Sequence, residues 1–481
     1  MHADASGLNP ALLEAEVDSF SIDSRDAQAG AVFFALSQPD YKNNCFNGDF
    51  EDSTPYAAQA LAGGATAAVV RPDRYIEHRS ALEQFQDKLI FVDDAIQAFQ
   101  KLAHGVYTAW NKPVVAVTGS AGKTTAKELT AHVLGRSGRR VLRNVKNYNN
   151  GLGLPITVLN LAKDDAFDVA VLEMGMSTPH NEIARLCRIT PPDVAVELNV
   201  YPVHVEHLGS IENVAKAKAE LVENMKPGGT AVLNADDFRV FAMRDLHDGT
   251  NVTYGIDVHA DVMAREIRID DAGKTHFRLE TPDGSAKVAF PLNGKHNILN
   301  ALAASAVGHV FKMSPAQIAA ALETVEAPPQ RGEVLRFKGN FTVINDTYNS
   351  NPDALLSMVR TLKEIGASAK RKILIAGEMR ELGADSAAIH YETGRQIAEL
   401  GVDAIFGVEG FAQNLLEGAR AAGVEDVEFY ENSEIAAEKF AGRIEAGDFV
   451  LIKGSRGVRT EKVVEKLLEK FGLEDKDAAT R

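Results

Sequence analysis

The sequence feature that most constrains the fold is a glycine-rich turn at residues 118–125, set between an apolar strand pattern and a helical pattern. Four apolar residues, Val114 to Val117, run directly into Thr-Gly-Ser-Ala-Gly-Lys-Thr-Thr. A turn of this kind between a strand and a helix is the context that a loop binding nucleotide phosphates requires. The pattern therefore predicts an α/β sheet whose edge binds a nucleoside triphosphate.

Each residue type in this turn has a physical role. Gly119 and Gly122 let the backbone turn sharply, while the helix N-terminus and Lys123 supply positive charge for phosphates. Thr124 supplies a hydroxyl group for Mg²⁺. The spacing departs from the common Gly-x4-Gly-Lys form, because Val117 stands five residues before Gly122. The alternative is an ordinary turn with a surface lysine. The predicted phosphate-binding residues are Gly119, Ser120, Ala121, Gly122, Lys123, Thr124 and Thr125.

The chain of 481 residues is too long for one hydrophobic core. Breaks at residues 110–113 and 327–332 interrupt helical patterns and divide it into three segments. We predict an α/β protein with three domains: a small α/β domain at 1–110, a central phosphate-loop domain with a parallel sheet at 111–327, and a doubly wound, Rossmann-like domain at 328–481. A period-two pattern between residues 261 and 292 predicts a small β-rich insert in the central domain.

Short apolar runs mark the strands, and their continuity favours parallel strands that are buried on both faces. The predicted strands of the central and third segments are 114–118, 169–173, 194–199, 341–344, 373–376, 404–408 and 449–452. The predicted helices of the central segment are 123–134, 213–225 and 297–311.

Charge and cysteine usage exclude several classes of protein. The 51 Lys and Arg against 67 Asp and Glu give a formal charge of −16, which disfavours a nucleic acid or an anionic membrane as partner. Cys45 and Cys187 are far apart and have no metal-ligand spacing, which is typical of a reducing compartment. The N-terminus has no signal-peptide pattern, and no stretch approaches the roughly 18 apolar residues of a membrane span. We expect a cytoplasmic protein.

Polar groups follow two of the predicted central strands. Glu173 ends one strand at the edge where ligands collect, and its carboxylate could hold Mg²⁺. The alternative for Glu173 is a solvated strand-end carboxylate. His204 follows the next strand and is a candidate ligand by that position alone, since a lone histidine is more often structural.

Two helices carry further candidates. Lys216 and Lys218 lie on different faces of one helix, so at most one points into a site, and the pattern by itself is typical of a solvated, charged helix. His296 and Asn300 share a face at the start of another helix. Adenine recognition and helix capping would both use these two residues.

The third segment adds polar groups at its strand ends. Asp346 could bind a ribose diol, and the following Tyr348 and Asn349 could pack against a purine. Lys453 and Arg456 form a cationic pair that suits a substrate carboxylate or a phosphate. Together these groups predict a second substrate surface.

These motifs resemble the Mur ligases over nearly the whole chain. The matching central motifs are Thr118–Thr125, Glu173-Met174-Gly175, Asn199–His204, Ala217-Lys218-Ala219-Glu220 and Gly294–Asn300, together with Asn147-Tyr148-Asn149-Asn150. In the third segment, Asp346-Thr347-Tyr348-Asn349-Ser350-Asn351-Pro352 and Gly377-Glu378-Met379-Arg380-Glu381-Leu382-Gly383 are similar to the D-alanyl-D-alanine-adding branch.

Near the N-terminus, Asp23-Ser24-Arg25 and residues 30–36 are similar to the family's uridine-nucleotide domain. The family's usual Asp-Gly-His element is absent, and Asn47-Gly48-Asp49-Phe50 stands nearby. The Tyr-Ala-His-x-Pro-Asp run that is typical of the diaminopimelate- and lysine-adding relatives is also absent.

The resemblance implies a role for each matched position. Lys123, Lys218 and His204 would be catalytic. Thr124, Glu173, His204 and Lys218 as a carbamate would hold Mg²⁺. Asn300, Arg331 and Asp346 would contact ATP together with the phosphate loop. The substrate residues would be Ser24, Arg25, Asn149, Asn150, Tyr348, Asn349, Asn351, Lys453, Ser455 and Arg456.

The implied reaction is an ATP-dependent ligation through an acyl-phosphate, in which magnesium and Lys123 offset the charge of the moving phosphoryl group. The implied partners are small molecules, a UDP-N-acetylmuramoyl tripeptide and D-alanyl-D-alanine, and we expect a monomer. The alternatives are another amino-acid-adding Mur ligase, a folylpolyglutamate-type synthetase, or a nucleotide-binding switch without ligase activity.

Overall fold

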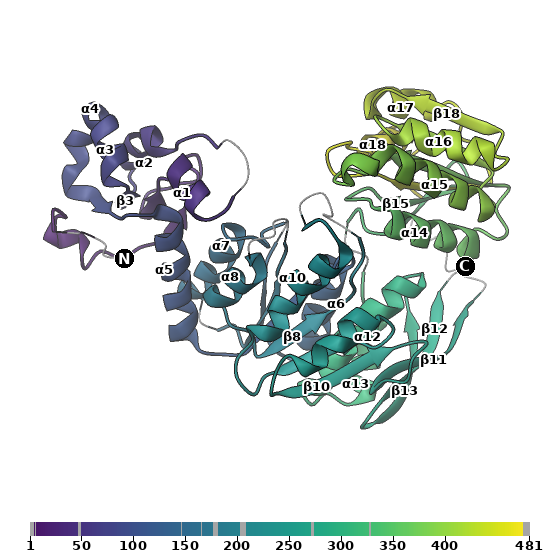
Figure 1. The fold of residues 1–481 in the computed structure, drawn as a ribbon, viewed down its shortest axis with the longest axis horizontal. Coiled ribbons are helices and arrows are strands. Elements are labelled where there is room, and N and C mark those ends of the chain that lie inside the picture. The colour runs from purple at the N-terminus through teal and green to yellow at the C-terminus, as the bar shows by residue number, and fades with distance from the viewer. Residues whose placement is uncertain are drawn as a thin grey trace.

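The structure is a computed structural model that describes residues 4, 6–46, 50–145, 147–164, 166–176, 181–202, 208–270, 274–326 and 329–474. Its strands form sheets of four, nine and six strands, one in each of three α/β domains. In Figure 1 the first and third domains stand at opposite ends of the central one. The predicted fold class is confirmed. The domain boundaries stay a prediction, and residues 327 and 328 lie outside the described residues.

The first domain has a parallel sheet in the order β1-β2-β3-β4. Its strands are β1 (Ser19–Ser21), β2 (Ala31–Phe34), β3 (Ala67–Val70) and β4 (Leu89–Phe91). Its helices are α1 (Gln38–Asn43), α2 (Ala57–Ala62), α3 (Pro72–Glu77), α4 (Arg79–Leu82) and α5 (Ala95–Trp110). Because α5 packs residues of both the first and the central sheet into one hydrophobic core, it joins the two domains.

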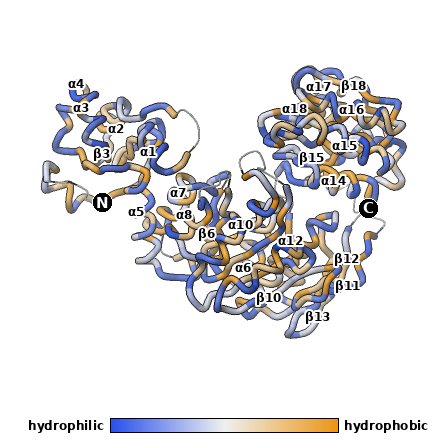
Figure 2. The backbone as a smooth tube through the Cα atoms, viewed as in Figure 1, coloured by the Kyte–Doolittle hydropathy of each residue, from blue (hydrophilic) through white to orange (hydrophobic). Residues whose placement is uncertain are grey.

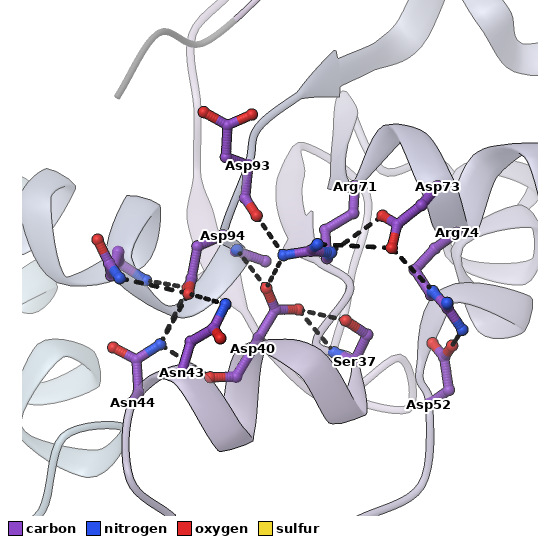
Figure 3. A network of polar contacts seen from close by, with 12 residues as sticks. Ser37, Asp40, Asn43, Asn44, Asp52, Arg71, Asp73, Arg74, Asp93 and Asp94 are labelled. Carbon is purple, nitrogen blue, oxygen red and sulfur yellow. Dashed lines mark hydrogen bonds and ion pairs between the residues drawn. The ribbon is translucent and has the colours of Figure 1, made fainter.

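A buried polar network fixes the start of α5 (Figure 3). Asp40 of α1 is buried and accepts a hydrogen bond from the Ala95 amide at 3.0 Å. Asp94, the N-cap of α5, accepts one from the Asn44 side chain at 3.0 Å. Arg71 lies 3.4 Å from the Asp40 carboxylate. These contacts bind α1, the end of β3 and the start of α5 together.

The central sheet has the order β13-β12-β11-β10-β9-β8-β5-β7-β6. Its strands are β5 (Val114–Thr118), β6 (Val141–Arg143), β7 (Val169–Glu173), β8 (Val194–Glu197), β9 (Thr230–Asn234), β10 (Thr250–Gly255), β11 (Val262–Ile269), β12 (Thr275–Thr281) and β13 (Gly284–Phe290). The strands from β6 to β11 run parallel, and β11, β12 and β13 are antiparallel. This antiparallel part confirms the predicted β-rich insert.

Helices cover both faces of this sheet. They are α6 (Lys123–Arg136), α7 (Gly153–Leu159), α8 (Glu182–Ile189), α10 (Ile211–Glu223), α11 (Phe238–Phe241), α12 (Lys295–Val310) and α13 (Pro315–Leu322). Val114 and Ala116 of β5 point into one hydrophobic core, while Val115 and Val117 point into the other. A strand with a core on each side needs an unbroken apolar run, which explains the sequence pattern.

The third domain has a sheet in the order β14-β15-β19-β16-β17-β18, in which β14 alone is antiparallel to its neighbour. Its strands are β14 (Glu333–Phe337), β15 (Phe341–Asp346), β16 (Arg371–Gly377), β17 (Ala404–Val408), β18 (Asp426–Tyr430) and β19 (Asp448–Lys453). Its helices are α14 (Pro352–Ile365), α15 (Ser386–Glu399), α16 (Ala412–Ala421), α17 (Ser433–Phe440) and α18 (Glu461–Phe471).

The carboxyl ends of β15, β16, β17 and β19 therefore lie along one edge of the third sheet. In Figure 2, polar and apolar residues are interspersed along the tube. Within the described residues, every helix is too short or too polar to cross a bilayer.

Candidate active site

The phosphate loop connects β5 to α6, and its glycines are required by close neighbours. Gly122 has φ of 81°, a conformation that side chains disfavour. A Cβ atom on Gly122 would lie 2.6 Å from Oδ1 of Asn300, the buried side chain that approaches from α12. Asn300 thus fills the space beside the turn, and only glycine fits there.

The segment after β8 holds the loop from the other side. The Ser120 amide donates to the Asn199 carbonyl at 3.0 Å, and the Ala121 amide donates to the Asn199 side-chain oxygen at 2.8 Å. The Tyr201 amide donates to the Ser120 hydroxyl at 2.9 Å. Because these amides are engaged, the donors left for a phosphate are the first amides of α6, which have no partner within the helix.

Lys123 opens α6 and folds over the loop. Its Nζ donates to the Gly119 carbonyl at 2.9 Å, so the ammonium group lies inside the turn. Burial lowers the pKa of Lys123, and the nearby Glu173 carboxylate opposes this effect. A bound polyphosphate would give this cation a stronger partner than a carbonyl oxygen.

Glu173 ends β7 beside the loop and is only 4% exposed. Its carboxylate accepts hydrogen bonds from the Thr124 hydroxyl and from the Asn149 side-chain amide, each at 2.7 Å. The side-chain oxygen of Asn144, a residue that no sequence motif indicated, accepts a hydrogen bond from the Glu173 amide at 2.9 Å. The alternative of a solvated strand-end carboxylate is wrong, because Glu173 is buried and fixed by neighbours.

The donor set around Glu173 fits Mg²⁺, which prefers hard oxygen ligands. A carboxylate and a threonine hydroxyl lie side by side next to the amides that would hold phosphate. His204, the third predicted ligand, lies outside the described residues. Among the described residues, no group of three His, Cys, Asp or Glu side chains converges on a metal position.

Lys218 of α10 is 1% exposed, whereas Lys216 is exposed. The solvated-helix interpretation is therefore wrong for Lys218. Burial, followed by repulsion from Lys123, lowers the pKa of Lys218 to about 7. An amine with such a pKa is largely neutral slightly above neutral pH, and a neutral amine is the form that reacts as a nucleophile.

The start of α12 contacts the third domain. His296 is partly buried, and its Nδ1 lies 3.1 Å from the Ser357 hydroxyl of α14. Burial lowers the pKa of His296 to about 4, so the ring is neutral at physiological pH. Asn300 packs against the phosphate loop, as described above. These two residues thus link the phosphate loop to the third domain.

The two predicted cations of the third domain form ion pairs with carboxylates of the same domain. Lys453 at the end of β19 pairs with Asp346 at the end of β15, at 2.6 Å, and donates to the Asn349 carbonyl at 2.7 Å. Arg456 pairs with Glu461 at 2.6 Å. The Arg456 side chain is largely exposed, so only Arg456 of the predicted pair extends into solvent.

Other predicted third-domain residues shape the loops. The Asn351 side chain caps α14 by accepting from the Ala354 amide at 2.9 Å. Ser455 accepts a hydrogen bond from the Arg380 amide at 2.9 Å. Arg331 stacks over the Tyr348 ring with 4.0 Å between the guanidinium carbon and the ring centroid.

Arg380 was not singled out from the sequence. It follows β16, and its guanidinium group pairs with Glu378 at 3.3 Å and with Glu409 at 2.7 Å. The sequence signal for Arg380 was its position as a cation just after a strand. The charged residues on either side of it made that signal indistinct.

A cavity of about 270 Å³ lies between the central and third domains. Predicted residues that line it are Ser120, Ala121, Gly122, Lys123, Thr124, Thr125, Asn149, Glu173, Asn300, Arg331, Asp346, Tyr348, Asn349, Asn351 and Lys453. The structure therefore brings the phosphate loop, the Glu173 carboxylate and the third-domain loop after β15 into one site.

Several predicted residues lie away from this cavity. Arg25 pairs with Asp23 at 2.5 Å in the first domain, next to Ser24. The Asn150 side chain accepts from the Gly153 amide at 2.9 Å and so stabilises its own turn.

Comparison with known proteins gives consistent matches. A family model described as the Mur ligase middle domain matches residues 117–308, and one described as the Mur ligase, glutamate ligase domain matches residues 330–456. The chain is 30% identical over 462 residues to UDP-N-acetylmuramoyl-tripeptide–D-alanyl-D-alanine ligase of Bacillus subtilis, covering 96% of this chain and 95% of the relative. It is 32% identical over 467 residues to the Escherichia coli protein of the same name, covering 96% of each.

Solved structures agree. A MurF structure from Acinetobacter baumannii matches with a TM-score of 0.82 and 28% identity, covering 98% of this chain and 100% of that one. MurF ligase from Thermotoga maritima in complex with ADP matches with a TM-score of 0.80 and 27% identity, covering 95% of this chain and 98% of that one.

The contact between Gly122 and Asn300 gives a prediction. Gly122→Ala would force a Cβ into Asn300 and strain the turn, so we expect about tenfold weaker Mg-ATP binding or more, measured as loss of the ATP-induced rise in Tm. The control is Gly135→Ala in the same helix, where no atom lies within 4 Å of the added methyl group. Equal ATP-induced shifts in the two variants would contradict the proposed fit.

Proposed function

The chain belongs to the Mur ligase family, and on that premise we propose how its interdomain cavity performs the family's reaction. It is an ATP-dependent ligase that adds D-alanyl-D-alanine to a UDP-N-acetylmuramoyl tripeptide, a step of peptidoglycan precursor synthesis. The observation that carries the mechanism is the arrangement of Lys123, Thr124 and Glu173 at one end of a cavity whose other wall is the third domain.

The chemistry explains why ATP is needed. A carboxylate is a poor acyl donor, because its oxygen is a poor leaving group. In the first step a terminal carboxylate oxygen of the tripeptide attacks the γ-phosphorus of ATP, and ADP leaves. In the second step the amino group of D-alanyl-D-alanine attacks the acyl carbon, phosphate leaves with the C–O bonding electrons, and the amine releases a proton. An amide bond, ADP and phosphate result.

The phosphate loop binds the triphosphate. The first amides of α6 and the Lys123 ammonium group would surround the transferring phosphate and offset its charge. The hydrogen bonds from the loop amides to Asn199 hold the loop in its conformation before ATP binds. Binding of ATP therefore does not carry the entropic cost of ordering the loop. Support for this assignment is that Lys123 already points into the turn.

We propose that Thr124 and Glu173 hold Mg²⁺, with His204 and Lys218 as further ligands. When bound, Mg²⁺ supplies positive charge to phosphate oxygens. Asn149 donates to Glu173 and so orients its carboxylate. We therefore propose a second role for Asn149, besides the predicted substrate contact: it positions the Glu173 carboxylate next to the metal.

We propose that the base and ribose of ATP lie against Asn300, Arg331 and Asp346. Arg331 and Tyr348 stack on each other in the cavity wall and present a flat surface of the kind that packs against a purine. Asp346 is held by Lys453, which fixes the direction of its carboxylate toward a ribose diol. A similar solved structure contains ADP, which supports a nucleotide in this cavity.

We propose that Lys218 carries a carbamate. The amine nitrogen would attack the carbon of CO₂, a C=O electron pair would move to oxygen, and the ammonium proton would pass to water. The product is an anion with two oxygens, which turns a repulsive lysine into a metal ligand. The low pKa of Lys218 supports this, because carbamate formation requires the neutral amine.

The remaining assignments follow the family. Ser24 and Arg25 would contact the uridine nucleotide in the first domain, with Asn150 nearer the tripeptide. The incoming dipeptide would bind at the third-domain edge, close to Asn349, Asn351, Ser455 and Arg456. The largely exposed Arg456 is suited to the dipeptide carboxylate.

Movement of the third domain toward the central one would then exclude water from the acyl-phosphate.

We propose that the enzyme acts as a monomer in the cytoplasm. One chain supplies residues from both walls of the cavity, and both cysteines are free. The alternative ligases considered from the sequence add other substrates, and the curated relatives compared above both carry the D-alanyl-D-alanine name.

The proposed reaction predicts a defined substrate requirement. With ATP, Mg²⁺ and a UDP-N-acetylmuramoyl tripeptide, phosphate release should depend on D-alanyl-D-alanine, because only an amine completes the second step. The measurement is the phosphate-release rate with the dipeptide, with free D-alanine and with neither. Turnover that ignores the dipeptide, or that prefers a free amino acid, would refute the assignment.

The proposed carbamate predicts the behaviour of Lys218→Ala. This variant should lose activity by about 10²-fold or more, and high bicarbonate should not restore it, since no amine remains to react. Lys216→Ala, two residues away and exposed, is the matched control and should keep its activity. Full activity of Lys218→Ala would remove the carbamate from the mechanism.

A further inference from the structure

A buried lysine lies in the helix that follows the phosphate loop, and the reaction described above gives it no role. Lys127 is three residues after Thr124, on the same side of α6, and is 1% exposed. A buried ammonium group is costly unless hydrogen bonds and an opposite charge compensate it. An apolar residue would serve better if packing were the only requirement, so the contacts of the ammonium group need an explanation.

The ammonium group of Lys127 has two partners. Its Nζ donates to the backbone carbonyl of Asn144 at 2.6 Å and lies 2.7 Å from the Glu128 carboxylate. Glu128 is partly exposed and also pairs with Arg143 at 2.9 Å, so Lys127 is not required to neutralise it. The contact that distinguishes Lys127 is therefore the one with the Asn144 carbonyl.

Asn144 connects the end of β6 to the end of β7. The last residues paired in the ladder of these strands are Arg143 and Val171. Beyond them, the side-chain oxygen of Asn144 accepts from the Glu173 amide, and its side-chain nitrogen donates to the Glu173 carbonyl, each at 2.9 Å. The buried Asn144 side chain thus binds both backbone groups of Glu173, as a paired strand would.

Asn144 also fixes the turn that carries Asn149. Its side-chain nitrogen donates to the Tyr148 carbonyl at 2.9 Å. The next residue, Asn149, donates from its side chain to the Glu173 carboxylate at 2.7 Å, and its carbonyl accepts from the Gly175 amide at 2.8 Å. Asn144 therefore contacts both the backbone of the acid and the residue that precedes Asn149.

Two residues of α6 hold this assembly at separate points. Thr124 donates to the Glu173 carboxylate at 2.7 Å, and Lys127 donates to the Asn144 carbonyl at 2.6 Å. Because one helix makes both contacts, the turn with Asn149 is held at a fixed position relative to the first turn of α6. Loss of the Lys127 ammonium group would leave a buried carbonyl without this donor, which favours movement of the turn away from the helix.

We propose that Lys127 is a positioning residue for the metal site. Through the Asn144 carbonyl, its ammonium group holds the turn whose Asn149 side chain orients the Glu173 carboxylate. Groups that orient a metal ligand without touching the metal typically change metal affinity about 10- to 100-fold when they are lost. The inference rests on the proposed function, because it takes Thr124 and Glu173 as ligands of Mg²⁺.

The test measures how much a metal ion strengthens nucleotide binding, by calorimetric titration of the enzyme with ADP in Mn²⁺ and in EDTA. Lys127→Met keeps an apolar side chain of similar length and removes the ammonium group. We expect the gain in ADP affinity from Mn²⁺ to fall about tenfold, with ADP affinity in EDTA unchanged, because the phosphate loop itself is intact. Lys127→Arg, which keeps a charged donor, should recover most of the gain.

Lys226→Met is the matched control. Lys226 pairs with Asp193 at 2.9 Å, and Asp193 accepts from the amide of Val114 at the start of β5. This ion pair lies at the opposite end of β5 from the phosphate loop, so its loss should lower Tm and leave the gain from Mn²⁺ unchanged. A role of Lys127 in stability alone predicts that same result for Lys127→Met.

The proposal is overturned if Lys127→Met keeps the parent's gain from Mn²⁺, or if its ADP affinity falls equally in Mn²⁺ and in EDTA. If Lys127→Met does not fold, Lys127→Gln, whose shorter side chain keeps an uncharged donor, must show a smaller loss of the same gain. Glu173→Gln tests the metal site separately. A parent-like gain in Glu173→Gln would refute the proposed metal site and this inference with it, whereas a parent-like gain in Lys127→Met alone refutes only the inference.

Discussion

The double hydrogen bond to the Glu173 carboxylate is the interaction on which the rest of the site depends. It joins the first turn of α6, through Thr124, to the turn that carries Asn149, and both to the end of β7. Hydrogen bonds to a charged group contribute roughly 1.5–3 kcal/mol each, and they fix a carboxylate that would otherwise be costly to bury. The carboxylate that we propose as a metal ligand is thereby held beside the amides that we propose bind phosphate.

The second constraint is that the site is shared by two domains. The central domain supplies the phosphate loop and the acid, while the third domain supplies a wall that contains Arg331, Asp346 and Tyr348. The contact between His296 and Ser357 lies where these domains meet, next to the helix whose Asn300 supports the loop. The helix α12 therefore contacts both the phosphate loop and the third domain. A site enclosed by two domains suits a reaction whose intermediate must be kept from water.

The sequence predicted the framework well because its signals were local. The strand at Val114–Thr118 and the strand that ends at Glu173 lie where the apolar runs placed them, since both are buried on two faces. The strand that starts at Val194 ends at Glu197 and not at residue 199, because the following residues turn to hold the phosphate loop.

What the sequence could not show were side-chain environments set by distant segments. The burial of Lys218 depends on packing that its helix pattern does not encode, and the unbonded carboxylate of Glu197 looked like part of an ordinary strand. Lys453 was predicted as a substrate cation, but it pairs with Asp346 from a strand about a hundred residues earlier in the chain. His204 lies outside the described residues, so its role stays a prediction.

The most direct test of the central claim is an experimental structure of the protein with Mg²⁺ and a non-hydrolysable ATP analogue. We predict that the γ-phosphate lies at the first amides of α6 beside Lys123, that the metal lies between Thr124 and Glu173, and that the purine lies against the third-domain wall. A nucleotide bound elsewhere, or a metal that does not contact Glu173, would contradict the account.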